Sequence, residues 1–215
     1  MMKYGHSALK LAMRGLVLSI VANAVVVDRI AVVVGTHAIK LSDIERELRT
    51  ASLLNRQPLD ESSAAMRKAA ERLIDQELVR EDLLRGQYSI PTQKDADAFL
   101  QQLKRDRFGG SETQFQAELA RHKLADDQLR KQLLWQLTVL RFIDQRFRPG
   151  VLVTDEDVAA WRQQHPAESR NATADQVRET LTDERITQAF EDWLAETRRD
   201  TRVEYKPQAF TGSTQ

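Results

Sequence analysis

Apolar residues recur at intervals of three and four over most of this chain, the spacing that places them on one face of a helix. The clearest example lies between residues 126 and 148, where Leu129, Leu133 and Leu137 share one side. Asp126 complements the positive N-terminal end of this helix. The spacing predicts helices over residues 41–54, 64–85, 94–108, 126–148, 154–166 and 175–201, with a short helix after Ser111.

Residues that begin or end helices support these assignments. Ser42 with Glu45, and Ser111 with Gln114, fit the reciprocal pattern of a capping box. Gly86 fits a helix stop. Only 8 glycines and 5 prolines occur in 215 residues, which favours long helices over many short strands.

Three short segments are better suited to strands than to helices. Residues 29–35 are rich in valine and are bounded by charge and by a Gly-Thr pair, a pattern that predicts a strand. Residues 37–40 are placed to return beside it, and residues 202–205 form a closing strand. The expected fold class is therefore mainly α, a multi-helix core with a small sheet.

The N-terminal region contains two valine runs separated by Asp28 and Arg29. The first 14 residues carry three basic residues and no acid, a short apolar stretch follows, and Ala22 to Ala24 fits a cleavage site. A membrane span through both runs would bury the two charges at ~2.5–3.5 kcal/mol each. We therefore predict a secretory signal peptide over residues 1–24, with an uncleaved inner-membrane anchor as the alternative.

Composition narrows the classes of partner. The chain has 32 basic and 32 acidic residues, and loss of residues 1–24 leaves 29 against 32, a net charge of −3. No basic stripe interleaved with aromatic residues occurs, so nucleic acid is not an expected partner. Cysteine is absent, which excludes disulfides and thiol chemistry.

Motifs for catalysis or metal binding are not found in the sequence. The four histidines are scattered, without the short spacings of zinc ligands. There is no P-loop, no dinucleotide-binding glycine motif and no nucleophile elbow. We therefore expect no metal, no cofactor and no catalytic residue.

The order of the segments resembles SurA-type periplasmic chaperones. "VDRIAVVVGTHAIKLSDIE" resembles the opening of that family's N-terminal domain, and "RLIDQELVREDLL" its second helix. Residues 111–147, followed by "VTDEDVAAWRQQHP", resemble the rest of that domain. "ERITQAFEDWLAETRRDTRVEY" resembles the family's C-terminal helix and strand, so the likeness covers most of residues 27–205.

One departure from the family pattern concerns the interval after Trp161. The family commonly inserts there a parvulin-type prolyl isomerase domain of about a hundred residues. In this chain the interval is a short polar linker that cannot hold a domain. The resemblance divides the chain into a signal at 1–24, a helical chaperone domain at 25–165, a linker at 166–174, a C-terminal helix and strand at 175–206, and a disordered tail at 207–215.

The resemblance also implies that the two ends of the mature chain meet. Residues 29–34 are expected to pair with residues 202–205, and the helices must cover this ribbon because an isolated two-stranded sheet is marginal. Truncation of either strand is then expected to expose the core.

The implied function is that of an ATP-independent holdase in the periplasm. It would bind unfolded or outer-membrane-bound polypeptides in an apolar groove, without stable membrane insertion once the signal is removed. Trp135 and Phe142 lie off the main apolar stripe of their helix, so they are the better candidates for an exposed surface or for one that contacts a second partner. The predicted client-binding residues are Leu48, Leu53, Leu54, Phe99, Leu103, Phe108, Trp135 and Phe142.

Two other functions are compatible with the same sequence. One is a prolyl isomerase-related enzyme, which would need a parvulin sheet and pocket. The other is a structural subunit whose groove holds one fixed partner.

Overall fold

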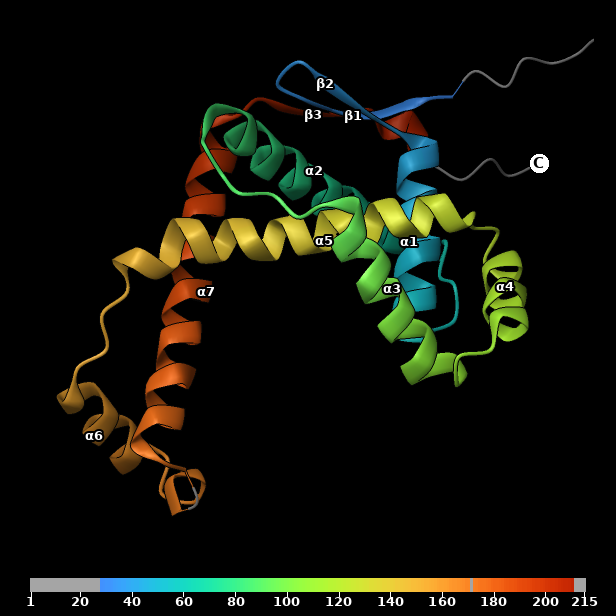
Figure 1. Cartoon of the computed structure of the whole chain (residues 1–215). Coiled ribbons are helices and arrows are strands. Elements are labelled where there is room, and N and C mark those ends of the chain that lie inside the picture. The colour runs from blue at the N-terminus through green and yellow to red at the C-terminus, as the bar shows by residue number, and fades with distance from the viewer. Residues whose placement is uncertain (1–27, 171, 211–215) are drawn as a thin grey trace, which may run out of the picture.

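The computed structural model describes residues 28–170 and 172–210 (Figure 1). This part of the chain is mainly helical, with one small sheet, which confirms the predicted fold class. The strands are β1 (Ile30–Val34), β2 (His37–Lys40) and β3 (Val203–Tyr205). The helices are α1 (Leu41–Asn55), α2 (Ser63–Arg85), α3 (Gln93–Phe108), α4 (Glu112–Arg121), α5 (Asp126–Phe147), α6 (Asp155–Gln164) and α7 (Ala174–Asp200). The predicted signal peptide lies outside the described residues.

The sheet has the strand order β2-β1-β3, and both pairings are antiparallel. Val34 lies opposite His37 on one side and opposite Val203 on the other. Gly35 opens the two-residue turn between β1 and β2 at φ +57°, a conformation that glycine adopts without strain. The pairing of β1 with β3 confirms the predicted contact between the two ends of the chain.

The first hydrophobic core lies between the sheet and helices α1 and α2. β-branched side chains of the central strand pack on apolar positions of both helices because strand residues alternate between the two faces of the sheet. The fully or nearly buried members are Ala31, Val32, Val34, Ile39, Ile44, Leu48, Ala69, Ala70, Ile74, Leu78, Ala209 and Phe210.

The C-terminal end of this core corrects one prediction. Residues 207–215 were expected to be disordered, but Pro207–Ala209 forms a 3₁₀ turn and Phe210 is only 3% exposed. The Arg67 guanidinium lies 5.2 Å from the centroid of the Phe210 ring. The Ser63 hydroxyl donates a hydrogen bond of 2.8 Å to the Phe210 carbonyl. The segment is mostly polar, but the apolar side chain of Phe210 anchors it to the first hydrophobic core.

A second hydrophobic core joins α3, α4 and α5 to the end of α1. Its buried members are Leu53, Leu100, Leu103, Phe115, Leu119, Leu124, Leu129 and Leu133. Lys104 is buried beside it, with its ammonium 4.2 Å from the centroid of the Phe115 ring and 2.9 Å from Glu112 Oε2. The buried charge therefore has both a carboxylate and an aromatic face as partners.

An aromatic cluster fixes α7 where it crosses α5; we call it the aromatic joint. Its members are Tyr88, Phe142, Phe147, Phe190 and Trp193, with ring centroids 5.0–6.1 Å apart. Phe142 lies at its centre and is 1% exposed, so it forms no exposed surface and instead packs against α7. The side of α5 that carries this ring is covered by α7, which the α5 sequence alone does not reveal.

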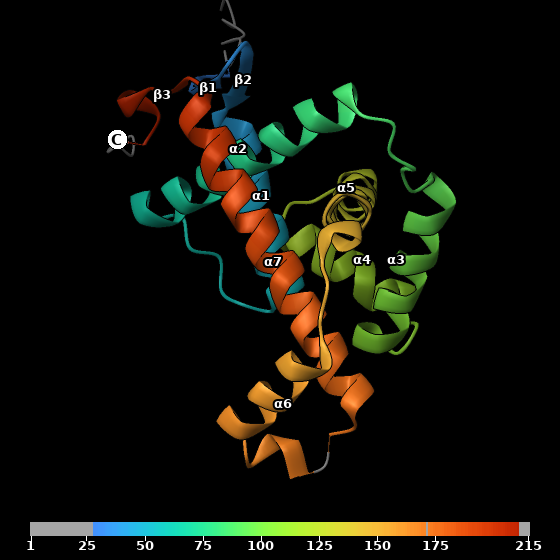
Figure 2. The same ribbon diagram turned by 90° about the vertical axis from the view of Figure 1, so that its left-hand side faces the viewer.

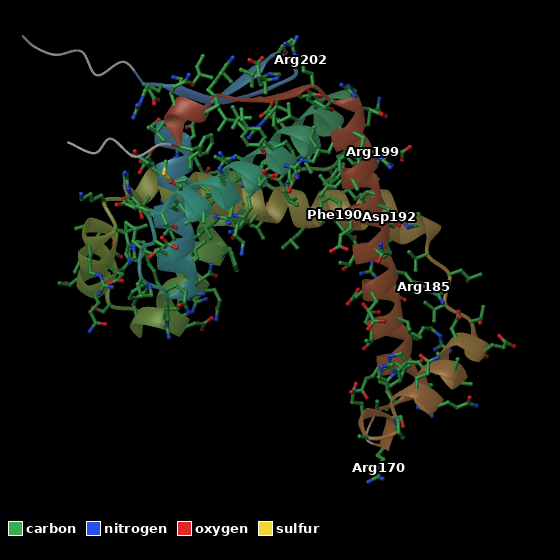
Figure 3. The ribbon with its side chains drawn as sticks, turned by 180° about the vertical axis from the view of Figure 1, so that it is seen from behind. Arg170, Arg185, Phe190, Asp192, Arg199 and Arg202 are labelled. Atoms are coloured by element: carbon green, nitrogen blue, oxygen red, sulfur yellow. The ribbon has the colours of Figure 1, made fainter. Side chains whose placement is uncertain are left out.

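Beyond the aromatic joint, α7 continues away from the body, and α6 packs beside it (Figures 1 and 2). We call α6, the turn at Glu168–Arg170 and the first half of α7 the arm. Arg185 of α7 bonds Asp157 of α6 at 2.8 Å, and Arg170 lies at the far tip (Figure 3). The predicted linker therefore forms the tip of the arm.

The capping predictions have different outcomes. Ser111 is the N-cap of α4 and accepts a hydrogen bond of 3.3 Å from the Gln114 N–H, as expected. The reciprocal half of the predicted capping box does not form, because the Ser111 N–H donates to the Phe108 carbonyl at 2.9 Å. Ser42 is not a cap, because α1 already begins at Leu41 and the Ser42 hydroxyl donates instead to Asp28 at 2.5 Å. Asp43 takes over the capping role by accepting the Lys40 N–H.

Candidate functional site

A cleft of about 650 Å³ opens between β2, α1, α2 and α5. Its volume lies in the range of clefts that hold small ligands or short peptide segments. The lining residues come from β2 (His37, Ala38, Ile39), α1 (Asp43, Arg46, Glu47, Thr50), α2 (Leu73, Gln76, Glu77, Arg80) and α5 (Gln128, Lys131, Gln132, Leu134, Trp135, Thr138). Four elements distant in sequence thus contribute to one site.

Trp135 and Arg80 both line the cleft and pack against each other. The Arg80 guanidinium lies 4.6 Å from the centroid of the Trp135 ring, a cation–π arrangement between α2 and α5. Arg80 also bonds Glu77 at 3.3 Å, which limits its freedom to leave the ring. Trp135 is half-buried and therefore presents part of its indole to the cleft. The pair supplies a flat, polarisable platform.

The charged residues of the cleft are largely paired within the protein. Glu47 is 8% exposed and accepts a hydrogen bond of 2.8 Å from Arg72. Arg46 pairs with Asp43, and His37 Nδ1 lies 3.3 Å from Glu77 Oε1. Three acidic and three basic side chains line the cleft, so their formal charges balance. Such a surface favours a neutral ligand over an anion or a cation.

Several neutral hydrogen-bonding groups of the cleft have no partner among the residues that the structure describes. These groups are the side-chain amides of Gln76 and Gln132 and the indole N–H of Trp135. Glu77 Oε1 is buried and faces His37 Nδ1 at 3.3 Å. The amide and indole groups are therefore available to form hydrogen bonds with a ligand in the cleft.

The structure brings only one of the predicted client-binding residues to this cleft, Trp135. Leu48 belongs to the first hydrophobic core, and Phe142 to the aromatic joint. Leu53, Leu54, Leu103 and Phe108 pack in or against the second core. These six side chains are therefore occupied by internal packing in this conformation.

Phe99 is the remaining predicted residue and is 40% exposed on α3, outside the cleft. The eight predicted residues therefore do not line one open groove. The cleft that the structure does contain is mixed in character, with Ile39, Leu73 and Leu134 among charged and amide side chains.

Sequence reasoning overlooked the polar residues of the cleft, although α5 carried a signal. Gln128, Gln132 and Trp135 recur at intervals of four and three on the side of α5 opposite its leucine stripe. A tryptophan embedded in a glutamine stripe is unusual for a purely solvated helix face. The partners from α1 and α2 follow no sequence pattern because tertiary packing alone brings them there.

No group of three or more potential metal ligands occurs in the described residues. Within the same part of the chain, none of the helices has the length and apolar character needed to cross a bilayer. A comparison with protein-family models gives no match, and a comparison with curated protein sequences gives none either. The resemblance to SurA-type chaperones therefore stays a prediction.

Proposed function

We propose that this protein is an ATP-independent chaperone that holds unfolded polypeptides, with the cleft as its client-binding site. The observation that carries the proposal is the combination of Trp135 with unpartnered amide groups in a charge-balanced cleft. A polypeptide offers matching chemistry, since its backbone alternates neutral donors and acceptors and its side chains supply apolar surface. The periplasm is the proposed compartment, on the basis of the predicted signal peptide.

Binding of this kind is expected to be reversible and of modest affinity. An unfolded client loses conformational entropy when it is ordered, and this cost offsets much of the gain from burial. The protein loses less entropy than the client on binding. Arg80 is already held by its hydrogen bond to Glu77, and Trp135 is held by its contact with Arg80. The cleft is therefore suited to many clients in turn.

The proposal is tested by suppression of aggregation. The mature protein, mixed at equimolar ratio with a chemically denatured reporter enzyme on dilution, should lower light scattering to the same extent with and without ATP. Trp135→Ala should weaken client binding ~30-fold, the loss typical of a central aromatic anchor.

Trp161→Ala is the matched control. Trp161 lies in the arm, stacked on His165 with ring centroids 4.5 Å apart, and it does not line the cleft. The two variants remove the same side chain from different places. Equal loss of holdase activity in both, or no loss with Trp135→Ala, would show that the cleft is not the client-binding site.

A further inference from the structure

The outer edge of β2 forms one wall of the cleft. In the described sheet β2 has a neighbour on one side only, because the strand order is β2-β1-β3. Ala38, in the middle of β2, is exposed and lines the cleft. The backbone of a strand edge therefore borders the same space as Trp135.

The hydrogen-bonding direction of Ala38 follows from the strand register. Val34 and His37 flank a two-residue turn, so they exchange backbone hydrogen bonds with each other. Bonding alternates along an antiparallel ladder, so Ala38, opposite Val33, directs its N–H and C=O away from β1. Lys40 has the same direction as Ala38, and its N–H reaches Asp43 Oδ2 at 3.1 Å instead of β1.

The open part of this edge is confined to Ala38. The Lys40 N–H already donates a hydrogen bond to Asp43, whereas the Ala38 N–H and C=O have no partner among the described residues. An unpaired strand edge is a ready template for another extended chain. Here that template is one residue long and points into the candidate site.

We propose that a client segment enters the cleft as an added β-strand, with one of its residues exchanging two backbone hydrogen bonds with Ala38. The inference rests on the proposed chaperone function and specifies how the client is recognised. The occupant is an extended, uncharged polypeptide segment, because the charges that line the cleft balance and its free groups match peptide amides. Sequence-independent backbone pairing suits a protein that holds many clients.

The geometry also determines which side chains of the client face the cleft. Ile39 is buried toward the helices and His37 lies beside Glu77 of α2, so both side chains point to the helical side of the sheet. In an added strand, the residues on either side of the one paired with Ala38 point in that same direction. Two client side chains, separated by one residue, therefore face Trp135 and Leu73 while the residue between them faces outward.

The test uses a fluorescein-labelled ten-residue peptide of uncharged residues in a non-repeating sequence, so that it can pair in one register only. Fluorescence anisotropy gives its Kd for the mature protein. Ala38→Pro deletes only the outward N–H, at an edge position where proline is tolerated, and should weaken binding about tenfold. Ala38→Ser keeps the N–H and should bind within twofold of the wild type.

Val203→Pro provides a second control, since it places proline on the opposite edge of the sheet, away from the cleft. This variant should bind the peptide as the wild type does. Thermal melts of the three variants show whether each is folded.

A scan of the peptide makes the test independent of protein stability. Each backbone amide of the peptide is methylated in turn and measured against the wild-type protein. Strand addition predicts that affinity falls about tenfold at the amide that pairs with Ala38 and much less at its immediate neighbours, which face away from β2.

The outcomes separate this inference from the function on which it rests. If Trp135→Ala abolishes binding but neither Ala38→Pro nor any methylated amide weakens it, the strand pairing is refuted and the cleft remains the client site. If Trp135→Ala leaves peptide binding unchanged, the proposed function and the strand pairing both fail. Loss with Ala38→Pro and with one methylated amide supports both.

Discussion

The hydroxyl of Tyr205 in the last strand donates a hydrogen bond to Glu71 in the middle of α2. The same carboxylate also accepts a hydrogen bond from Arg198 near the end of α7. Glu71 therefore ties the C-terminal strand and the last turn of α7 to the first hydrophobic core. The small sheet is held to the helices by a polar contact as well as by burial.

Tyr205→Phe should lower the free energy of unfolding by about 1 kcal/mol, because it removes a hydrogen bond to a charged, half-exposed partner and leaves the ring in place. Urea unfolding measures the change. A double-mutant cycle with Glu71→Gln isolates the pair. A coupling energy near zero would show that the contact does not stabilise the fold.

Phe210 should be essential for stability although it lies five residues from the end of the chain. A chain that ends at Phe210 should melt close to one that ends at Gln215, whereas one that ends at Lys206 should melt well below both. Phe210→Ala should cost ~3–5 kcal/mol, the usual range for a buried phenylalanine. Equal melting temperatures for the two truncated chains would contradict the burial of this ring.

Arg146 should hold the aromatic joint together. Its guanidinium lies 2.8 Å from Asp82, 2.9 Å from the Tyr88 hydroxyl and 5.2 Å from the centroid of Trp193. Arg146→Met should cost ~1–3 kcal/mol, since it leaves the Asp82 charge without its partner. Hydrogen exchange in α7 should rise most near this crossing.

Arg141→Met is the control for the aromatic joint. Arg141 is exposed on the same helix and makes none of these contacts. A similar loss of stability in both variants would mean that the joint has no special role.

Asp75 and Asp157 should change stability with pH in opposite directions. Burial raises the pKa of Asp75 to about 6, whereas hydrogen bonds from Arg185 and the Thr154 N–H lower the pKa of Asp157 to about 2. A raised carboxyl pKa favours the folded state when the group is protonated. That contribution is complete below about pH 4, the pKa of an unfolded chain, and is lost as pH rises through 6.

Asp75→Asn should therefore be more stable than the wild type at pH 8, by a margin that shrinks between pH 7 and pH 4. Asp157→Asn should be less stable than the wild type above pH 4, and that difference should vanish as pH falls toward 2. Urea midpoints at several pH values measure both. If Asp75→Asn is less stable than the wild type at pH 8, the attraction of Asp75 to Arg198, 3.5 Å away, contributes more to stability than burial of the charge costs.

Much of the fold could be predicted from the sequence because the local signals agree with the tertiary structure. The chain has a valine-rich run at residues 30–34, a short segment RVEY at residues 202–205 and few glycines or prolines in between. These features allowed the paired strands and the long helices to be predicted. The helix boundaries followed from apolar spacing and from residues such as Gly86, which does end α2.

The parts that could not be predicted depend on contacts between distant segments. The α5 sequence favours an exposed or partner-contacting position for Phe142, because nothing in that helix shows that α7 covers the ring. Ser42 failed as a cap because Asp28, fourteen residues earlier, captures its hydroxyl. The cleft combines Arg80 of α2 with Trp135 of α5, a pair that only the packed structure brings together.

The position of β3 at the end of the chain also sets the order in which the protein can be completed. Ribosomes release a polypeptide from its N-terminus, so β1 emerges long before β3, the strand with which it pairs. Contacts between residues this far apart in sequence slow folding, because the intervening chain must be ordered first. Until β3 is free to pair, β1 has an unpaired edge, so this protein itself exposes a strand edge while it is being made.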